Sequence, residues 1–466
     1  MSYLNAKNFR VTYILKLFTL YIWFALFFYL ISFLGGGGIK FREGIPWYVL
    51  ISRDIVWLGF VTYLIYCIRR NSFWHQLWMS DYGKFLKIFT ILCGIYLIIV
   101  LSHLIHRDLR EIIQHDIRNI LSYSLIIFFL PLIIQKKEDI YSLMNTLLKV
   151  GMVLSLFGIV TRFMGLDFLT WRGRVVSTMS DPNNLGIFLS FCILLVVINW
   201  KSLSIWKAVL YFLIYSFALV LTNSITAFLT INFALFVILL LKKGWIKGFA
   251  IFFAVFYLFI CLSFVSKIVE NPGKLFNNFS RKTYNTDKYL IDRLNNISKG
   301  KFAKWFLFGI DYQVQDETMR SLTYRKAQFS AFAGVKNTEV KETEGVNKLI
   351  TLFGNYKSKE YATFDNQYFN FLFNAGIVST LIFFSLFTWG VVRGIINYLN
   401  FHKVDKDLAM LSLFFSVFLL TMILVAFNGA AFLNRFPLNF LIYFSLGMIF
   451  LIKEIQKGKW VRNETF

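Results

Sequence analysis

Long apolar stretches recur along almost the whole chain, and each has about the length of a helix that crosses a bilayer. They measure about 15 to 24 residues, and roughly 20 helical residues span the hydrocarbon core. Few prolines or glycines interrupt them, which favours helices over the alternating pattern of a membrane β-barrel. The pattern predicts about twelve transmembrane helices, near 11–34, 46–68, 85–105, 120–134, 143–163, 185–199, 208–222, 226–241, 248–265, 366–390, 408–428 and 436–452.

One long polar segment, residues 267–364, interrupts this pattern. Its 98 residues contain 17 Lys and Arg against 10 Asp and Glu. We therefore divide the chain into a membrane domain with nine helices (1–266), a large basic loop (267–364) and a membrane domain with the last three helices (365–466). The loop is thus attached to the membrane domain at both of its ends.

Composition narrows the class of protein. Of 466 residues, 57% are hydrophobic and 16% are charged, which excludes a soluble globular chain and predicts an all-α polytopic membrane protein. All four cysteines lie in apolar stretches and lack metal-site spacing, so we interpret them as packing residues. Because no Walker A, GxSxG, HExxH or Rossmann pattern is present, we expect neither ATP hydrolysis nor nicotinamide chemistry, and hence no cofactor. The outer segments hold no DxD-like pair or His/Asp cluster, so we also expect no metal. A nucleic-acid partner is not expected either.

Lys and Arg in the short loops predict the orientation, because positively charged loops tend to stay in the cytoplasm. With the N-terminus inside, the inner segments carry 20 Lys and Arg and the short outer segments carry 8. Both termini are therefore predicted to be cytoplasmic, and 267–364 faces outward, since long loops translocate regardless of charge. Between the third and fourth spans, 107–118 has helical spacing of apolar residues and is predicted to be an interfacial helix on the outer leaflet.

A conspicuous outer segment leads into the sixth predicted helix. Asp181-Pro182 is typical of an N-cap followed by proline at the first helical position. The positive helix end then shares the outer compartment with Arg172 and Arg174, which favours a site for an anion such as a pyrophosphate. The alternative, that these arginines contact lipid headgroups, stays open. In the next outer turn, we expect Ser224 and its neighbouring hydroxyls to cap helix ends.

Two outer segments carry a family pattern. The arginine-containing loop before SDPNNLGIFLS (180–190) resembles the helix start of the O-antigen polymerase and ligase superfamily. DNQYFNFLFNAGIVS (365–379) resembles the same superfamily's helix start after its large periplasmic loop, and Arg293 ahead of WFLFG (305–309) is similar to a third piece. Ligases typically carry His where this chain has Asp365, which favours a polymerase.

The resemblance implies a GT-C-like fold and an inverting, metal-independent glycosyltransferase in the bacterial inner membrane. Its donor and acceptor would be glycans linked to undecaprenyl pyrophosphate, and a chain-length regulator and a flippase would be its protein partners. It implies Asp365 as the catalytic base and Arg293 as a catalytic arginine. A helix-capping role for Asp365 is the alternative. The residues expected to bind substrate are Arg172, Arg174, Asn183, Asn366, Tyr368, Arg320 and Arg325.

Two other functions stay open at this point. An O-antigen ligase, which transfers polymer to lipid A core, belongs to the same enzyme class. A flippase for lipid-linked oligosaccharides also has about twelve helices, but it does not require a 98-residue outer loop between two such helix starts.

Overall fold

The protein is described here from a computed structural model. It describes residues 13–25, 47–69, 77–105, 109–164, 170–171, 174–175, 177, 182–199, 203–222, 224–243, 367–426 and 438–457. Besides a helix at Tyr13–Ala25, the elements are α2 (Trp47–Arg69), α4 (Asp81–Ser102), η2 (His103–Ile105), α5 (Leu109–Ile112), η3 (Ile113–Ser122), α6 (Ile126–Ile133), α7 (Lys137–Phe163), β1 (Thr170–Trp171), β2 (Arg174–Val175), α8 (Pro182–Asn199), α9 (Ile205–Thr222), α10 (Ile225–Lys243), α15 (Gln367–Phe401), α16 (Lys406–Val425) and α17 (Leu438–Gln456).

The described chain is a helical, multi-pass membrane protein. Within the described residues, eight helices are long and apolar enough to cross a membrane: Asp81–Ser102, Asp116–Ile133, Lys137–Phe163, Pro182–Asn199, Ile205–Thr222, Asn374–Phe401, Lys406–Val425 and Leu438–Gln456. Eleven of the twelve predicted apolar stretches overlap a helix, and 248–265 lies outside the described residues. The helical class is confirmed, and the count of twelve stays a prediction.

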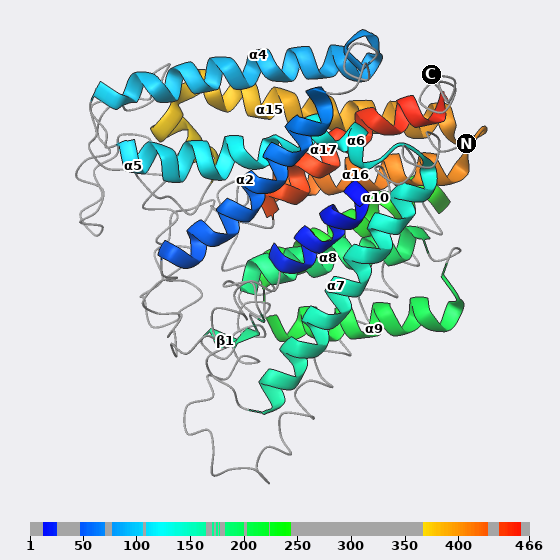
Figure 1. Ribbon diagram of the computed structural model, residues 1–466. Helices are drawn as coiled ribbons and strands as arrows, with labels where there is room; N and C mark the ends of the chain where they lie inside the picture. Colours follow the sequence, from blue (N-terminus) through cyan, green and yellow to red (C-terminus); the bar gives the residue numbers. More distant parts are fainter. Residues whose placement is uncertain are drawn as a thin grey trace, which may run out of the picture.

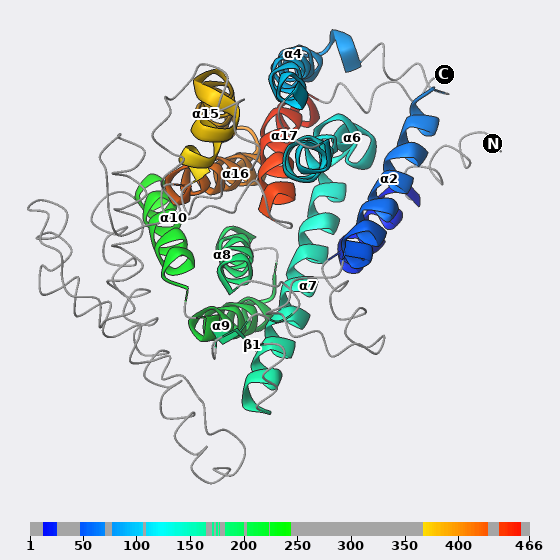
Figure 2. The ribbon, with the colours of Figure 1, turned by 90° about the vertical axis from the view of Figure 1, so that its left-hand side faces the viewer.

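The helices form two groups that share α16. In the first group α17 packs against α4, α6, α15 and α16, and in the second α8 packs against α7, α9 and α10. Figure 2 views the bundle nearly end-on and shows both groups. Because α16 contacts α8 and α10 as well as α15 and α17, it connects the two groups.

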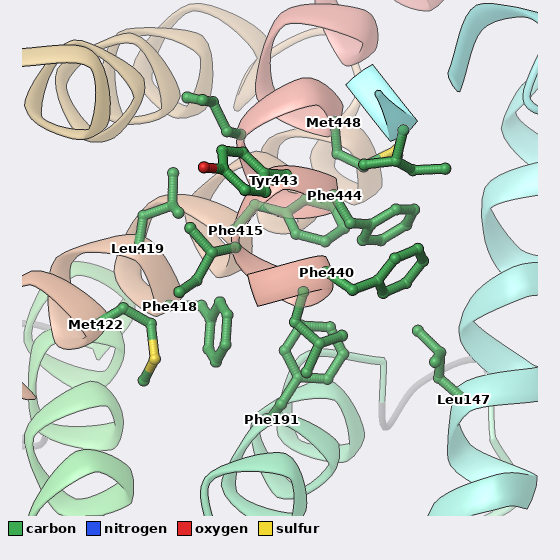
Figure 3. Packing of buried hydrophobic residues seen from close by; sticks show 14 of the residues in the cluster. Leu147, Phe191, Phe415, Phe418, Leu419, Met422, Phe440, Tyr443, Phe444 and Met448 are labelled. Atoms are coloured by element: carbon green, nitrogen blue, oxygen red, sulfur yellow. The ribbon is translucent and has the colours of Figure 1, made fainter. Parts of the chain in front are cut away.

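Aromatic side chains fill the space between these central helices. The ring of Phe191 on α8 lies 4.8 Å from that of Phe414 and 4.9 Å from that of Phe418 on α16. On the other side of α16, the rings of Phe415 and Phe444 are 5.8 Å apart. Figure 3 shows this packing. Since lipid tails are as apolar as these side chains, close packing rather than transfer from water holds such helices together.

The predicted interfacial helix is not a separate element. Helical structure continues from Leu109 through the π-helical η3 to Ile133, and Asp116–Ile133 is long and apolar enough to be a span. Ile112 and Asp116 are buried, although apolar spacing alone gave no reason to bury an aspartate. The α-helical spacing assumed for this segment was wrong, because a π-helix changes the residues that share a face. Its location on the outer leaflet stays a prediction.

Residues predicted to lie on one side of the membrane do meet at one end of the bundle. Asp81 at the start of α4 accepts a hydrogen bond from Lys453 at 2.6 Å and another from Lys457 at 2.5 Å, at the end of α17. Lys137 at the start of α7 donates to Asp405 at 2.9 Å. In Figure 1 these helix ends lie at the right, whereas α8 and α15 begin at the left. The helix directions therefore agree with the alternation that the sequence predicted.

Asp405 has two roles at this end. Its carboxylate accepts hydrogen bonds from the N–H groups of Asp407 and Leu408, so it caps α16, and it also pairs with Lys137. Burial would raise the pKa of Asp405, but the N–H of Leu408 and the Lys137 ammonium favour the charged form and hold the pKa below its usual value. Asp405 therefore stabilises the folded protein in its charged form.

Replacing Asp405 with Ala is expected to lower the free energy of unfolding by about 1–2 kcal/mol, from the lost cap and the lost ion pair. Asp405→Asn keeps the cap and should lose less. Because the folded pKa is depressed, the contribution is complete above the unfolded pKa of about 3.9 and disappears as the pH falls below it. Thermal unfolding in detergent at pH 7 and near pH 3 measures this. Equal melting temperatures of wild type and Asp405→Ala at pH 7 contradict it.

Candidate functional site

The start of α8 is fastened to the turn between α9 and α10. Pro182 is the first residue of α8, and the half-buried Asn183 follows it. The hydroxyl of Ser224 donates a hydrogen bond to Asn183 Oδ1 at 2.7 Å. The same hydroxyl oxygen accepts from the N–H of Ala227 at 3.2 Å, so Ser224 also caps α10, as the sequence predicted. One side chain thus links two segments that lie about 40 residues apart in sequence and were both predicted to be on the outer side.

The start of α15 is fastened to the end of α16. The Tyr368 hydroxyl donates to the carbonyl oxygen of Ile423 at 2.9 Å. Burial raises the pKa of Tyr368 to about 12, so this hydroxyl keeps its proton and acts as a donor at neutral pH. The Tyr368 ring also stands edge-on to Phe384, at 6.4 Å between centroids. The tyrosine predicted to bind substrate therefore also holds its own helix in place.

A break divides α15 soon after its start. Gly376 has φ 83°, in a region that L side chains rarely adopt, so residues 367–375 and 377–401 are two helical segments. The Gly376 carbonyl oxygen accepts a hydrogen bond from the Thr380 hydroxyl at 2.9 Å. This glycine of the motif-bearing segment 365–379 is thus required by backbone conformation. It gives the first segment of α15 a direction of its own.

A short hairpin carries one of the predicted arginines. β1 and β2 pair antiparallel, with Thr170 opposite Val175 and Trp171 opposite Arg174, which leaves Arg172 and Gly173 between the paired residues. The hairpin was not expected in a chain predicted to be all-α. Glycine is common at the second position of a two-residue connection, but Arg-Gly is not one of the pairs that predict a hairpin by themselves.

The hairpin segment is held against α7. Val175 is fully buried, and a Cβ placed on Gly158 would lie 2.7 Å from its Cγ1. Two residues later the buried Ser177 has φ 53° and donates its hydroxyl hydrogen to the Leu154 carbonyl oxygen at 3.1 Å. Gly158 therefore allows a close approach that fixes the strand containing Arg174.

The structure describes only some of the predicted site residues. Asn183 and Tyr368 lie at helix starts, on α8 and α15, which both pack against α16. The backbone of Arg174 is in β2. The other predicted site residues lie outside the described residues: Arg172, Arg293, Arg320, Arg325, Asp365 and Asn366. In the part of the chain that the structure describes, no three His, Cys, Asp or Glu side chains could hold a metal ion together.

No family model and no curated protein matches the chain. The functional assignment consequently depends on the residues themselves and on their arrangement. Sequence reasoning did not foresee the bond between Ser224 and Asn183, because a hydroxyl in a turn signals only a cap. Nor did it foresee Gly158, since a glycine inside a helix does not reveal which neighbour approaches it.

Proposed function

We propose that the protein is a glycosyltransferase that polymerises undecaprenyl-pyrophosphate-linked oligosaccharide repeat units into O-antigen or a related surface polysaccharide. In this proposal it is a GT-C-like enzyme of the bacterial inner membrane with about twelve helices and cytoplasmic termini. Residues 267–364 then form a periplasmic loop, and synthesis takes place at the periplasmic face.

The common location of the two motif-bearing helix starts carries this proposal. α8 begins at Pro182 and α15 at Gln367, and both begin at the end of the bundle opposite to Asp81 and Lys457 (Figure 1). Two helix starts more than 180 residues apart in sequence therefore lie at the same end of the bundle and, in this proposal, face the same compartment. An enzyme that holds a pyrophosphate at one helix start and activates a hydroxyl beside the other needs this arrangement.

The chemistry follows from the substrate class. The acceptor hydroxyl attacks the anomeric carbon of the donor, a new C–O bond forms with inversion, and undecaprenyl pyrophosphate leaves with the electron pair of the broken C–O bond. Asp365 takes the proton of the hydroxyl. Arg172, Arg174 and Arg293 stabilise the charge that develops on the leaving pyrophosphate, because a guanidinium pairs with two phosphate oxygens and stays ionised.

The fixed hairpin supports this assignment of roles. Electrostatic stabilisation of a leaving group is effective when the charged group is already in place before reaction. The strand containing Arg174 is held by the contact of Val175 with Gly158 and by the bond of Ser177 to Leu154. An arginine that served only to contact lipid headgroups would not need such anchoring.

A deletion strain tests the proposal and separates it from the alternatives. Loss of a polymerase should leave lipid A core with a single repeat unit on a lipopolysaccharide gel, because ligation still works. Bare core together with polymer on the carrier lipid would instead indicate a ligase. A flippase would be indicated if inverted membrane vesicles from the deletion strain no longer translocate labelled lipid-linked repeat units.

Ser224→Ala is expected to reduce polymerisation by purified enzyme about fivefold, since a lost hydrogen bond of roughly 1 kcal/mol releases Asn183 at the start of α8. Ser224→Thr keeps a hydroxyl for both bonds and should retain most of the activity. Polymer formed from lipid-linked repeat units is measured on a gel, with the amount of folded protein matched. An unchanged rate for Ser224→Ala would show that this bond does not position Asn183 for the reaction.

A further inference from the structure

Tyr96 contacts both segments of the broken helix α15. This fully buried residue of α4 has its ring 6.4 Å from that of Phe371 and 5.1 Å from that of Phe383, at steep angles of 69° and 80°. The two phenylalanines come from opposite sides of Gly376, and their own rings are 4.8 Å apart. A single aromatic side chain of α4 is thus positioned to hold the angle between the two segments.

The other end of Tyr96 is attached to a second irregular helix. Its hydroxyl donates a hydrogen bond to Asp116 Oδ1 at 2.7 Å. Asp116 is buried and belongs to the ten-residue π-helical stretch η3, and it is the first residue of a helix apolar enough to cross a membrane, Asp116–Ile133. π-helical turns are rare and frequently mark functional positions. Through Tyr96, this stretch is connected to the break in α15.

Packing alone does not explain this pair of residues. A phenylalanine at position 96 would make the same ring contacts, and a carboxyl group inside a membrane helix is costly to bury. Apolar residues could replace this buried polar pair at little cost in stability. The hydrogen bond between Tyr96 and Asp116 is directional, however, and it fixes the tyrosine ring relative to η3. Its distinctive contribution is therefore orientation.

We propose that Tyr96 and Asp116 are positioning residues that set the direction of residues 367–375, the segment of α15 that Asp365 and Asn366 directly precede. The effect on catalysis depends on the proposed function. The effect on the helical segment does not. Two measurements therefore test the two parts separately.

The first measurement is amide hydrogen exchange of the full-length protein in lipid nanodiscs. Tyr96→Phe keeps the ring but removes the hydroxyl, and Asp116→Ala removes the acceptor. Both are expected to speed exchange in 367–375 about tenfold relative to 377–401. Asp116→Asn keeps an oxygen that can accept from Tyr96 and should resemble wild type. Unchanged exchange of 367–375 in Tyr96→Phe and Asp116→Ala would overturn the proposal.

Two further variants test whether faster exchange reflects a general loss of stability of the protein rather than the loss of this hydrogen bond. Tyr215→Phe also removes a buried tyrosine hydroxyl, which donates to the Leu148 carbonyl between α9 and α7, so exchange in 367–375 should stay as in wild type. The double variant Tyr96→Phe/Asp116→Leu removes the donor and the acceptor of this hydrogen bond together, so neither of the two is left without the other, and it should fold even if the single variants do not. Faster exchange of 367–375 in this folded double variant supports positioning, and wild-type exchange overturns it.

The second measurement is the rate of polymerisation of lipid-linked repeat units. Tyr96→Phe is expected to lower kcat about tenfold with KM unchanged, and Asp116→Asn should recover the wild-type rate. If Asp116→Asn is as slow as Asp116→Ala, the carboxyl group acts by itself and the positioning role is overturned. If wild type makes no polymer, the proposed function fails, and hydrogen exchange alone decides whether the pair positions 367–375.

Discussion

Replacing Asp365 with asparagine should abolish the polymer ladder while the amount of protein in the membrane stays unchanged. A general base typically contributes 10²- to 10⁴-fold to a rate, and an amide cannot take a proton at neutral pH. Asparagine caps a helix about as well as aspartate, so the start of α15 is expected to remain folded. The assay is polymer formation by purified enzyme from lipid-linked repeat units.

A matched substitution distinguishes loss of the catalytic base from the general effect of losing one negative charge. Asp316→Asn makes the same chemical change within 267–364 but outside the segments that carry the family pattern, and it should leave the ladder intact. Asp365→Ala removes the carboxylate and also any oxygen at this position that could cap the helix. If Asp365→Asn is fully active and Asp365→Ala is not, Asp365 is a helix cap and the base must be another group.

Replacing Arg172, Arg174 or Arg293 with lysine should slow polymerisation about 10- to 100-fold at each position that contacts the leaving group. Lysine keeps the charge but loses the planar fork, and one charge-assisted hydrogen bond is worth roughly 1.5–3 kcal/mol. Because that contact strengthens as the pyrophosphate leaves, the lysine substitution should lower kcat. Steady-state rates and the length of the ladder measure it.

The lysine variants also test the alternative role of these arginines. A residue that only attracts anionic substrate or headgroups works equally well as lysine, so its variant should be unchanged in rate and sensitive to salt. Arg320 and Arg325 take the place of Arg293 if only their lysine variants are slow. Full activity in all three primary variants and in Asp365→Asn would remove the proposed site, and the helical fold would be unaffected.

Apolar stretches predicted the positions of the described helices well, because helix formation in a membrane follows from the length of the apolar run and from internal hydrogen bonding. The capping role of Ser224 was predictable for a similar reason, since it depends on residues close in sequence. The family pattern pointed to α8 and α15, and the structure gives a backbone reason for Gly376 in the second of them.

Features that depend on distant contacts were not predictable from the sequence. Nothing near Asp116 indicates that Tyr96 will donate to it, and nothing near Gly158 indicates that Val175 will pack against it. An α-helical period was assumed for 107–118, whereas the structure has a π-helix from Ile113 onward. These features are determined by which helix packs against the segment, and a single sequence does not show which helix that is.

The ion pairs that join Asp81 to the end of α17 have a consequence for how the protein is made. Its partners Lys453 and Lys457 follow it by 372 and 376 residues, so at about 5–20 residues per second they are synthesised roughly 20 to 75 s later. Until then α4, α6 and α16 expose the faces that α17 will cover. A ribosome that stops before Leu438 therefore releases a chain without its most buried described helix, and its disposal by membrane proteases would follow.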